Sequence, residues 1–275
     1  SWATIGARVG VSPAVLAARN GRGLKPPLKD GETIVIDSRH GVPEEWSGLD
    51  GTDDGIIVNV PQRLVFHFAD GRLQAHYPAA VGGAGWQTPL GDFTIVMKEE
   101  NPTWDVPLSI QDEMRRAGKR VVKSVPPGPA NPLGRVWLGL SLDSVGIHGT
   151  TAPLSIYGFA THGCIRLHPD DIDALFQQVA AGDRGRIIYE PVLVAYDGRD
   201  VQPFPPDHNH ADEQARFGQV ARQWNLVHKQ GSPEWKALLA EFKSLGLILD
   251  PTMTAYLASR NVMYRRSADW HEKYT

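Results

Sequence analysis

Residues 161–167 read THGCIRL and contain the only cysteine of the 275-residue chain, Cys164. A free thiol has a pKa of about 8.5, so a nucleophilic cysteine needs a neighbouring base or a positive charge at neutral pH. His148 and His162 lie close in sequence and could supply the base. Arg166 projects to the same side as the thiol in an extended chain, where its charge would favour the thiolate. The stretch therefore predicts a cysteine acyl-transfer site.

Gly163 directly precedes the nucleophile. Glycine lets the backbone approach a substrate closely or adopt a turn that is closed to other residues. Backbone N–H groups in such a turn can form an oxyanion hole. We expect the N–H groups of Gly163 and Cys164 to take this role.

The segment around this stretch, residues 55–195, is rich in strand signals. Short apolar runs alternate with turns, and Asp70-Gly71 is typical of a hairpin. One helix is expected from Pro169 to about Ala180, with aspartates in its first turns and a glycine at its end. The pattern predicts a mainly antiparallel sandwich or barrel. The expected strands are 55–60, 63–68, 73–79, 92–97, 135–140, 144–148 and 186–189.

Residues 99–134 interrupt the strand pattern with several prolines and a helical piece around 110–117. A segment of this length inside a compact domain is usually a functional loop or lid. A tolerated surface insertion is the alternative.

Two further regions flank the strand-rich segment. Residues 1–45 predict the order helix, helix, strand, with a Ser-Pro helix start at 12–13 and a short strand at 32–36. Residues 203–206 (PFPP) predict a boundary. The helical extension that follows, 207–275, has apolar faces that we expect to pack on the main domain.

Composition narrows the classes of function. The chain has 41% hydrophobic and 21% charged residues and a formal net charge of −3. These values fit a globular protein with a sizeable core and argue against nucleic-acid or acidic-lipid binding through bulk charge. No apolar run approaches the roughly 20 residues of a membrane-spanning helix. The sequence has neither His-Glu-x-x-His nor paired Cys-x-x-Cys, so we expect no metal, and we expect no cofactor.

Around His148 and Cys164 the sequence resembles a known family, the L,D-transpeptidases with the YkuD-type catalytic domain. That family carries a His-Gly pair, a short spacer, and Ser/Thr-His-Gly-Cys followed by an apolar residue and Arg or Asn. Here His148-Gly149 and residues 161–166 match throughout. The resemblance implies the family's β-sandwich with one main helix after the nucleophile.

The resemblance extends over residues 55–195. The stretches 101–104 and 127–134 are similar to the subgroup found in Gram-negative bacteria. Residues 1–45 resemble part of a LysM module, which binds the glycan of peptidoglycan; the usual first strand and its Gly-Asp are absent from the match. Residues 207–275 fall outside the resemblance.

The resemblance implies a two-step acyl transfer on peptidoglycan stem peptides. Cys164 would attack the carbonyl of diaminopimelate at the third position of a tetrapeptide stem, and the terminal D-alanine would leave. An amine of another stem would then attack the acyl-enzyme and form a cross-link. The substrate places the protein in the periplasm, with a signal peptide removed before Ser1, and makes it a carbapenem target.

The resemblance also assigns roles. His148 is the general base and later the acid, and the backbone carbonyl of Gly149 orients its ring, as the third group of a triad does. His162 lines the site or acts as a secondary proton partner. Thr161 orders the loop through its hydroxyl. Arg166 either binds a substrate carboxylate or braces the loop.

Aromatic residues supply candidate pocket walls. Trp104 and Tyr157 are the main candidates, together with Phe159, although aromatics at such positions are often core residues. His168 is expected only to begin the helix that follows it.

Several alternatives remain open. Water in place of the amine would make the protein an L,D-carboxypeptidase or endopeptidase. A lysine of an outer-membrane lipoprotein is another acceptor. A zinc enzyme would draw its ligands from the ten histidines and the cysteine. A non-catalytic wall-binding module would use the LysM-like segment as an anchor, but the intact His-Gly and Thr-His-Gly-Cys pattern argues against it.

Overall fold

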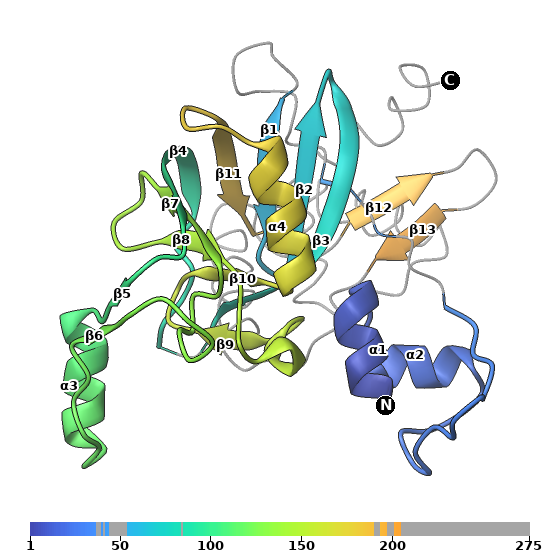
Figure 1. Ribbon diagram of the computed structural model, residues 1–275. Coiled ribbons are helices and arrows are strands. Elements are labelled where there is room, and N and C mark those ends of the chain that lie inside the picture. The colour runs from blue at the N-terminus through green and yellow to red at the C-terminus, as the bar shows by residue number, and fades with distance from the viewer. Residues whose placement is uncertain are drawn as a thin grey trace, which may run out of the picture. The chain divides into compact units, whose positions relative to one another are not determined.

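A computed structural model describes residues 1–36, 40, 42–43, 54–83 and 85–189, together with the backbone of two strands at 193–196 and 201–204. The chain divides into two compact units, residues 1–38 with 46–189, and residues 39–45 with 190–275. The helices predicted within 207–275 lie outside the described residues. The described part of the first unit is mainly β, as predicted (Figure 1).

Nine described strands of the first unit form one sheet that closes on itself. The order is β10-β8-β7-β4-β11-β1-β2-β3-β9, and β10 also pairs with β3, which closes the ring. Six of the pairings are antiparallel, while β1–β11, β8–β10 and β3–β9 are parallel. The strands are β1 (Gly55–Asn59), β2 (Leu64–Ala69), β3 (Arg72–Gly82), β4 (Gly91–Glu100), β7 (Val136–Leu140), β8 (Gly146–His148), β9 (Phe159–Thr161), β10 (Ile165–Leu167) and β11 (Arg184–Ile188).

Two long strands belong to both halves of this closed sheet. The first part of β3 pairs with β2, whereas Ala79 and Ala80 pair with β10. The first part of β4 pairs with β11, and its second part pairs with β7. Register shifts in the β2–β3 and β4–β7 ladders mark irregularities of the kind that bend a strand. Because both halves share bent strands, the fold has the two packed layers of a sandwich and the closure of a barrel.

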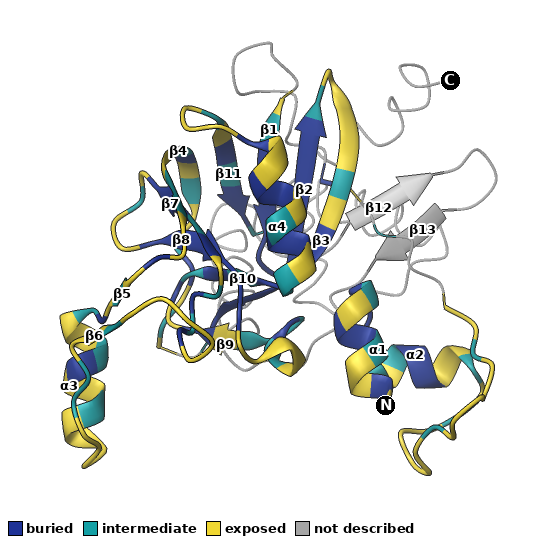
Figure 2. Ribbon diagram, in the orientation of Figure 1, coloured by how far each residue is buried: buried dark blue, intermediate teal, exposed yellow. Residues whose placement is uncertain are grey.

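The core lies between the two halves of the sheet. In β1, Ile56 and Val58 join this core, whereas Ile57 lies in a second cluster with Phe66. This alternation follows from the two-residue period of a strand, and burial on both faces explains the continuous apolar run of β1. The helix α4 (Pro169–Gln178) contributes three apolar side chains to the core, and Figure 2 shows its buried and exposed faces.

The helix α4 begins where the sequence predicts, but it ends at Gln178, before the expected Ala180 and the glycine at position 182. His168 is its N-cap, with the ring accepting a hydrogen bond from the N–H of Asp170. Pro169 occupies the first helical position, where its missing N–H has no cost. The helix follows directly after β10, so it anchors the strand that begins beside Cys164.

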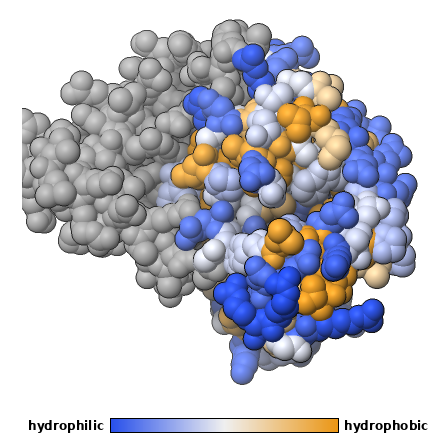
Figure 3. Space-filling model, turned by 90° about the vertical axis from the view of Figure 1, so that its left-hand side faces the viewer, coloured by the Kyte–Doolittle hydropathy of each residue, from blue (hydrophilic) through white to orange (hydrophobic). Residues whose placement is uncertain are grey.

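Between β4 and β7 the chain leaves the sheet as an arm, defined as residues 101–134. The arm contains β5 (Trp104–Asp105), α3 (Leu108–Arg116) and β6 (Ser124–Val125), and β5 pairs with β6. The helix confirms the helical piece predicted around 110–117. On the side that carries the arm and β4, Figure 3 shows apolar surface next to strongly hydrophilic groups.

One buried amide holds the base of the arm. Asn131 is fully buried, and its Nδ2 donates to the carbonyl of Pro102 at 2.8 Å and lies within 3.3 Å of the carbonyls of Val125 and Pro126. Its Oδ1 accepts from the N–H of Leu133. The two ends of the arm are therefore tied together at the point where it joins the sheet.

The N-terminal segment contains two helices, α1 (Trp2–Val9) and α2 (Pro13–Arg19), and Ser12 caps the second as predicted. The strand predicted at 32–36 is wrong, because a strand needs a neighbour to pair with and the described residues offer none there. The side chain of Asn20 instead bonds both the N–H and the carbonyl of Val35, at 2.7 and 2.9 Å. The likeness to a LysM module stays a prediction.

In the second unit the structure describes β12 (Leu193–Tyr196) and β13 (Val201–Phe204), which pair antiparallel. This pairing was not predicted from the sequence. Across the described residues, no helix is both long enough and apolar enough to cross a membrane.

Candidate active site

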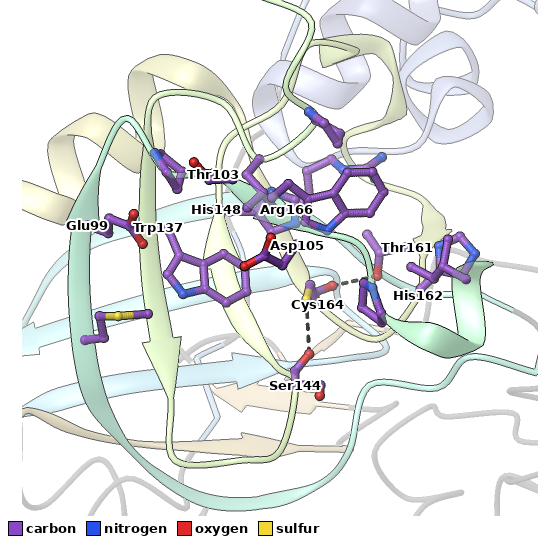
Figure 4. A pocket seen from close by; sticks show the side chains of 17 residues that line it. Glu99, Thr103, Asp105, Trp137, Ser144, His148, Thr161, His162, Cys164 and Arg166 are labelled. Atoms are coloured by element: carbon purple, nitrogen blue, oxygen red, sulfur yellow. Dashed lines mark hydrogen bonds between the residues drawn. The ribbon is translucent and has the colours of Figure 1, made fainter. Parts of the chain in front are cut away.

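A pocket of about 460 Å³ opens beside Cys164 (Figure 4). About half of its lining residues come from the arm, and the others come from β4, β7, β8, β9, β10 and the loops around them. The residues that the sequence predicted and that line it together with the cysteine are Trp104, His148, Thr161, His162 and Arg166.

Strand pairing brings the predicted nucleophile and base together. The strands β8 and β10 are parallel neighbours, with Ile147 beside Ile165 and His148 beside Arg166. Cys164 directly precedes β10, and its thiol accepts from the N–H of Gly146 at the start of β8. The pairing therefore joins two motifs that are separated by a loop in the sequence.

His148 is buried, with 4% of its surface exposed. Its Nδ1 lies 2.6 Å from the carbonyl oxygen of Gly149, which is the contact that the resemblance implies. Burial lowers the pKa of the imidazole to about 4, and the charge of Arg166 acts in the same direction. The carbonyls of Gly149 and Leu133 oppose this shift. The imidazole is therefore neutral at physiological pH, the form that can accept a proton.

The Cys164 thiol differs from its prediction in one respect. Burial raises its pKa above the usual range, while the N–H of Gly146 and the charge of Arg166 lower it. Arg166 thus acts in the predicted direction, but desolvation is the larger effect. In the part of the chain that the structure describes, the Sγ hydrogen bonds to the carbonyl of Ser144 at 3.7 Å and not to His148 (Figure 4). The resting site holds a neutral thiol and a neutral imidazole.

Thr161 ties the loop that carries the nucleophile. Its hydroxyl donates to the carbonyl of Cys164 at 2.6 Å and accepts from the N–H of Gly163 at 3.2 Å. Gly163 has φ = 111°, the positive value that the sequence led us to expect of a glycine here. Its N–H is already used within the loop, which is a correction to its predicted part in an oxyanion hole. The N–H of Cys164 is the remaining candidate of the two.

Arg166 contacts the loop before β9. Its Nη1 donates to Oγ of Ser155 at 3.0 Å, and that hydroxyl in turn donates to the carbonyl of Ala152. Its Nε is buried without a hydrogen-bond partner. The contact with Ser155 agrees with the predicted bracing of a loop, and the binding of a substrate carboxylate stays a prediction.

His162 lies between the arm and a second loop. Its Nε2 is 2.9 Å from Oε2 of Glu113 on α3, and its ring meets the indole of Trp86 edge to face at 4.7 Å. Both members of the His162–Glu113 pair are partly exposed. Glu113 and Trp86 were not predicted from the sequence, because no local signal links residues so far apart in the chain.

Of the aromatic candidates, Trp104 lines the pocket from the arm, but Tyr157 does not line it. The prediction for Tyr157 is corrected because its ring stacks on the guanidinium of Arg63 at 4.1 Å, with Phe159 on the same cation at 5.0 Å. Such cation–π contacts order the chain leading into β9. The indole of Trp137, which the sequence analysis missed, lines the pocket instead.

Among the described residues, no group of three or more His, Cys, Asp or Glu side chains could hold a metal ion. The pocket brings together a thiol, a neutral imidazole and a partly buried guanidinium. Together these are the parts of covalent acyl transfer.

The closed β fold and this pocket are those of a domain equipped for cysteine-dependent acyl transfer. The chain belongs to the YkuD family, the L,D-transpeptidase catalytic domain, whose family model matches residues 53–194. The family and its mainly β fold, both expected from the sequence, are thereby confirmed.

Relatives carry the same family name. A protein of Escherichia coli (strain K12) named "Probable L,D-transpeptidase ErfK/SrfK" is 35% identical over 185 residues, which cover 64% of this chain and 59% of that protein. "Probable L,D-transpeptidase YbiS" of the same strain is 33% identical over 172 residues, covering 62% and 54%. The match thus spans little more than half the length of these relatives. A solved L,D-transpeptidase from Mycobacterium smegmatis is 23% identical with a TM-score of 0.39, covering 48% of this chain and 57% of that one.

Proposed function

We propose that the protein forms peptidoglycan cross-links as an L,D-transpeptidase. Membership of the YkuD family supports the class of reaction. The arrangement of the side chains around the pocket supports the roles given to them. The observation that carries the proposal is the pairing of β8 with β10, which places a neutral, buried His148 and the Cys164 thiol at one pocket. A cysteine needs such a base because its own pKa is raised here.

In the first step the Cys164 thiol turns from Ser144 toward His148, which takes its proton as the sulfur attacks the donor carbonyl. A C–S bond forms, and the oxyanion develops next to the N–H of Cys164. The tetrahedral intermediate collapses with loss of the terminal D-alanine, whose amine receives the proton from His148. The ring orientation needed for both transfers is held by the carbonyl of Gly149.

In the second step an amine from another stem peptide attacks the thioester. His148 removes the proton of this amine, the C–S bond breaks, and the thiol is regenerated. Arg166 lines the pocket, and in this proposal its guanidinium binds a carboxylate of the donor. Thr161 and His162 complete the walls, with Trp104 on the arm.

In this proposal the location and the partners of the protein follow from its substrate. Peptidoglycan stems lie outside the inner membrane, so the protein works in the periplasm. The acceptor is an amine of a second stem; water would give a carboxypeptidase or endopeptidase, and a lysine of an outer-membrane lipoprotein would give attachment to the wall. The LysM-like residues 1–45 would add contact with glycan, and the arm would serve as a lid.

Acylation by a carbapenem tests the proposal. The intact mass of the wild-type protein should rise by one carbapenem, and Cys164→Ser should show no adduct. Incubation with purified tetrapeptide muropeptides should then give a dimer with loss of D-alanine. If a monomeric tripeptide is the only product, the acyl-enzyme is resolved by water and the reaction is hydrolysis, not transfer. Full activity in Cys164→Ala would overturn the covalent mechanism.

A further inference from the structure

Trp137 and His148 form a cross-strand pair. They lie directly opposite each other on the antiparallel strands β7 and β8. Their rings are stacked, with centroids 5.8 Å apart and an interplanar angle of 27°. Both side chains line the pocket (Figure 4). The indole is therefore a flat surface against which the imidazole rests.

Two glycines make room for this indole. A Cβ atom at Gly146 would lie 2.3 Å from the six-membered ring of Trp137, a distance that real contacts do not reach. A Cβ atom at Gly139 would come within 3.0 Å of its Nε1. Gly146 begins β8, two residues before His148. The absence of side chains at these positions fixes where the indole lies.

Other groups around the imidazole differ in charge. Arg166 faces it from β10 and disfavours its protonation, while the carbonyls of Gly149 and Leu133 favour it. The thiol of Cys164 lies in the same pocket, as do the carboxylates of Glu99 on β4 and Asp105 on β5. Burial remains the largest influence on His148, and the Trp137 indole covers one face of its ring. Removing the indole would admit water to that face.

We propose that Trp137 is a positioning residue of this site: its indole fixes the plane of the His148 ring and keeps water away from it. The inference rests on the proposed function only in taking His148 as the base. It predicts that the indole acts through His148 and not through substrate contact alone.

The test follows the titration of His148 by NMR in the full-length protein, with the resonance assigned by its loss in His148→Gln. In the wild type the ring should titrate near pH 4, as its burial implies. In Trp137→Ala the midpoint should move up toward the ordinary value of about 6.5. Trp137→Phe, which keeps a flat ring, should remain close to the wild type. Trp104→Ala removes an indole from the arm side of the pocket and should leave the His148 midpoint unchanged.

The rate of carbapenem acylation gives a second readout. With a midpoint near 6.5, only about a tenth of the ring is neutral at pH 5.5, so Trp137→Ala should lose about tenfold in maximal rate there relative to pH 7.5. Trp104→Ala should weaken initial binding without this added pH dependence.

Gly146→Ala keeps Trp137 but displaces its indole, and should shift the His148 midpoint in the same direction. This second variant keeps the inference testable if Trp137→Ala does not fold. A folded Trp137→Ala or Gly146→Ala protein with an unchanged midpoint would overturn the inference. A shifted midpoint in a protein that forms no carbapenem adduct would support the role of Trp137 and count against the proposed function, so the two failures are distinguishable.

Discussion

Arg166 and His148 are neighbours across the parallel pair of β10 and β8, and the guanidinium helps to lower the pKa of the imidazole. The same charge lowers the pKa of Cys164 against the larger effect of burial. One cation therefore adds to the effect of burial in keeping the imidazole of His148 neutral, and it partly offsets the desolvation of the Cys164 thiol.

Replacing this cation should slow the chemistry of the thiol. In Arg166→Met the pKa of Cys164 should rise further, since the charge that lowers it is gone. Each unit of pKa lowers the thiolate population about tenfold, so we expect alkylation by iodoacetamide at pH 8 to slow by about three- to tenfold. Ser155→Ala removes the loop contact of Arg166 but keeps the charge. Equal slowing in both variants would show that the loop contact, and not the charge of Arg166, controls the alkylation rate of the thiol.

The burial of His148 should make folding stability depend on pH. The folded-state pKa of about 4 lies below the ordinary value near 6.5, so the unfolded chain binds more protons between these values. The contribution of His148 to the free energy of unfolding is then fully present above about pH 6.5. It falls by on the order of 3 kcal/mol as the pH drops toward 4. Urea unfolding at pH 7, 5.5 and 4.5 measures it.

The control for this prediction uses a second buried histidine. Burial also lowers the pKa of His67, which belongs to β2 and lies outside the pocket lining. His148→Gln should flatten the pH dependence of unfolding, and His67→Gln should leave the contribution of His148 in place. The prediction would be wrong if His148→Gln kept the wild-type pH dependence.

The contact between the arm and the nucleophile loop should control opening of the arm. Glu113→Gln weakens the pair with His162. Because exposed ion pairs contribute only about 0–1 kcal/mol, the melting temperature should change little. Amide hydrogen exchange in α3 should nevertheless become faster. Asp112→Asn is the matched control, since Asp112 pairs with Arg115 on the same helix. Identical exchange in the two variants would contradict a specific link to His162.

The amide of Asn131 should be essential to the base of the arm. Asn131→Ala leaves the buried carbonyl of Pro102 without its donor, and such a loss typically costs about 1–3 kcal/mol. Asn131→Asp has nearly the same shape but cannot donate when ionised, so it should be destabilised as well. The exposed Ser109→Ala on α3 serves as the control. Thermal unfolding measures all three, and a wild-type melting temperature for Asn131→Asp would refute the role of the donor.

Much of the local structure could be predicted because it depends on neighbouring residues. The Asp70-Gly71 hairpin forms where expected, with both residues at positive φ. The helix after Pro169 starts at the predicted position, and Gly163 adopts a positive φ. The strand at 32–36 failed for the opposite reason, since a strand depends on a partner that local sequence does not reveal.

The sequence by itself determined the candidate nucleophile, the histidine-glycine pair and the mainly β pattern, because residue type and spacing carry that information. Only the tertiary structure decided that β10 pairs with β3 to close the sheet, that Trp137 stacks on His148, and that Glu113 reaches His162. It also decided that the pKa of Cys164 is raised, whereas the nearby arginine alone suggested a lower one. The physical reason is that desolvation and ring contacts depend on which distant segments fold together, and each of these acts over a few ångströms in space regardless of separation along the chain.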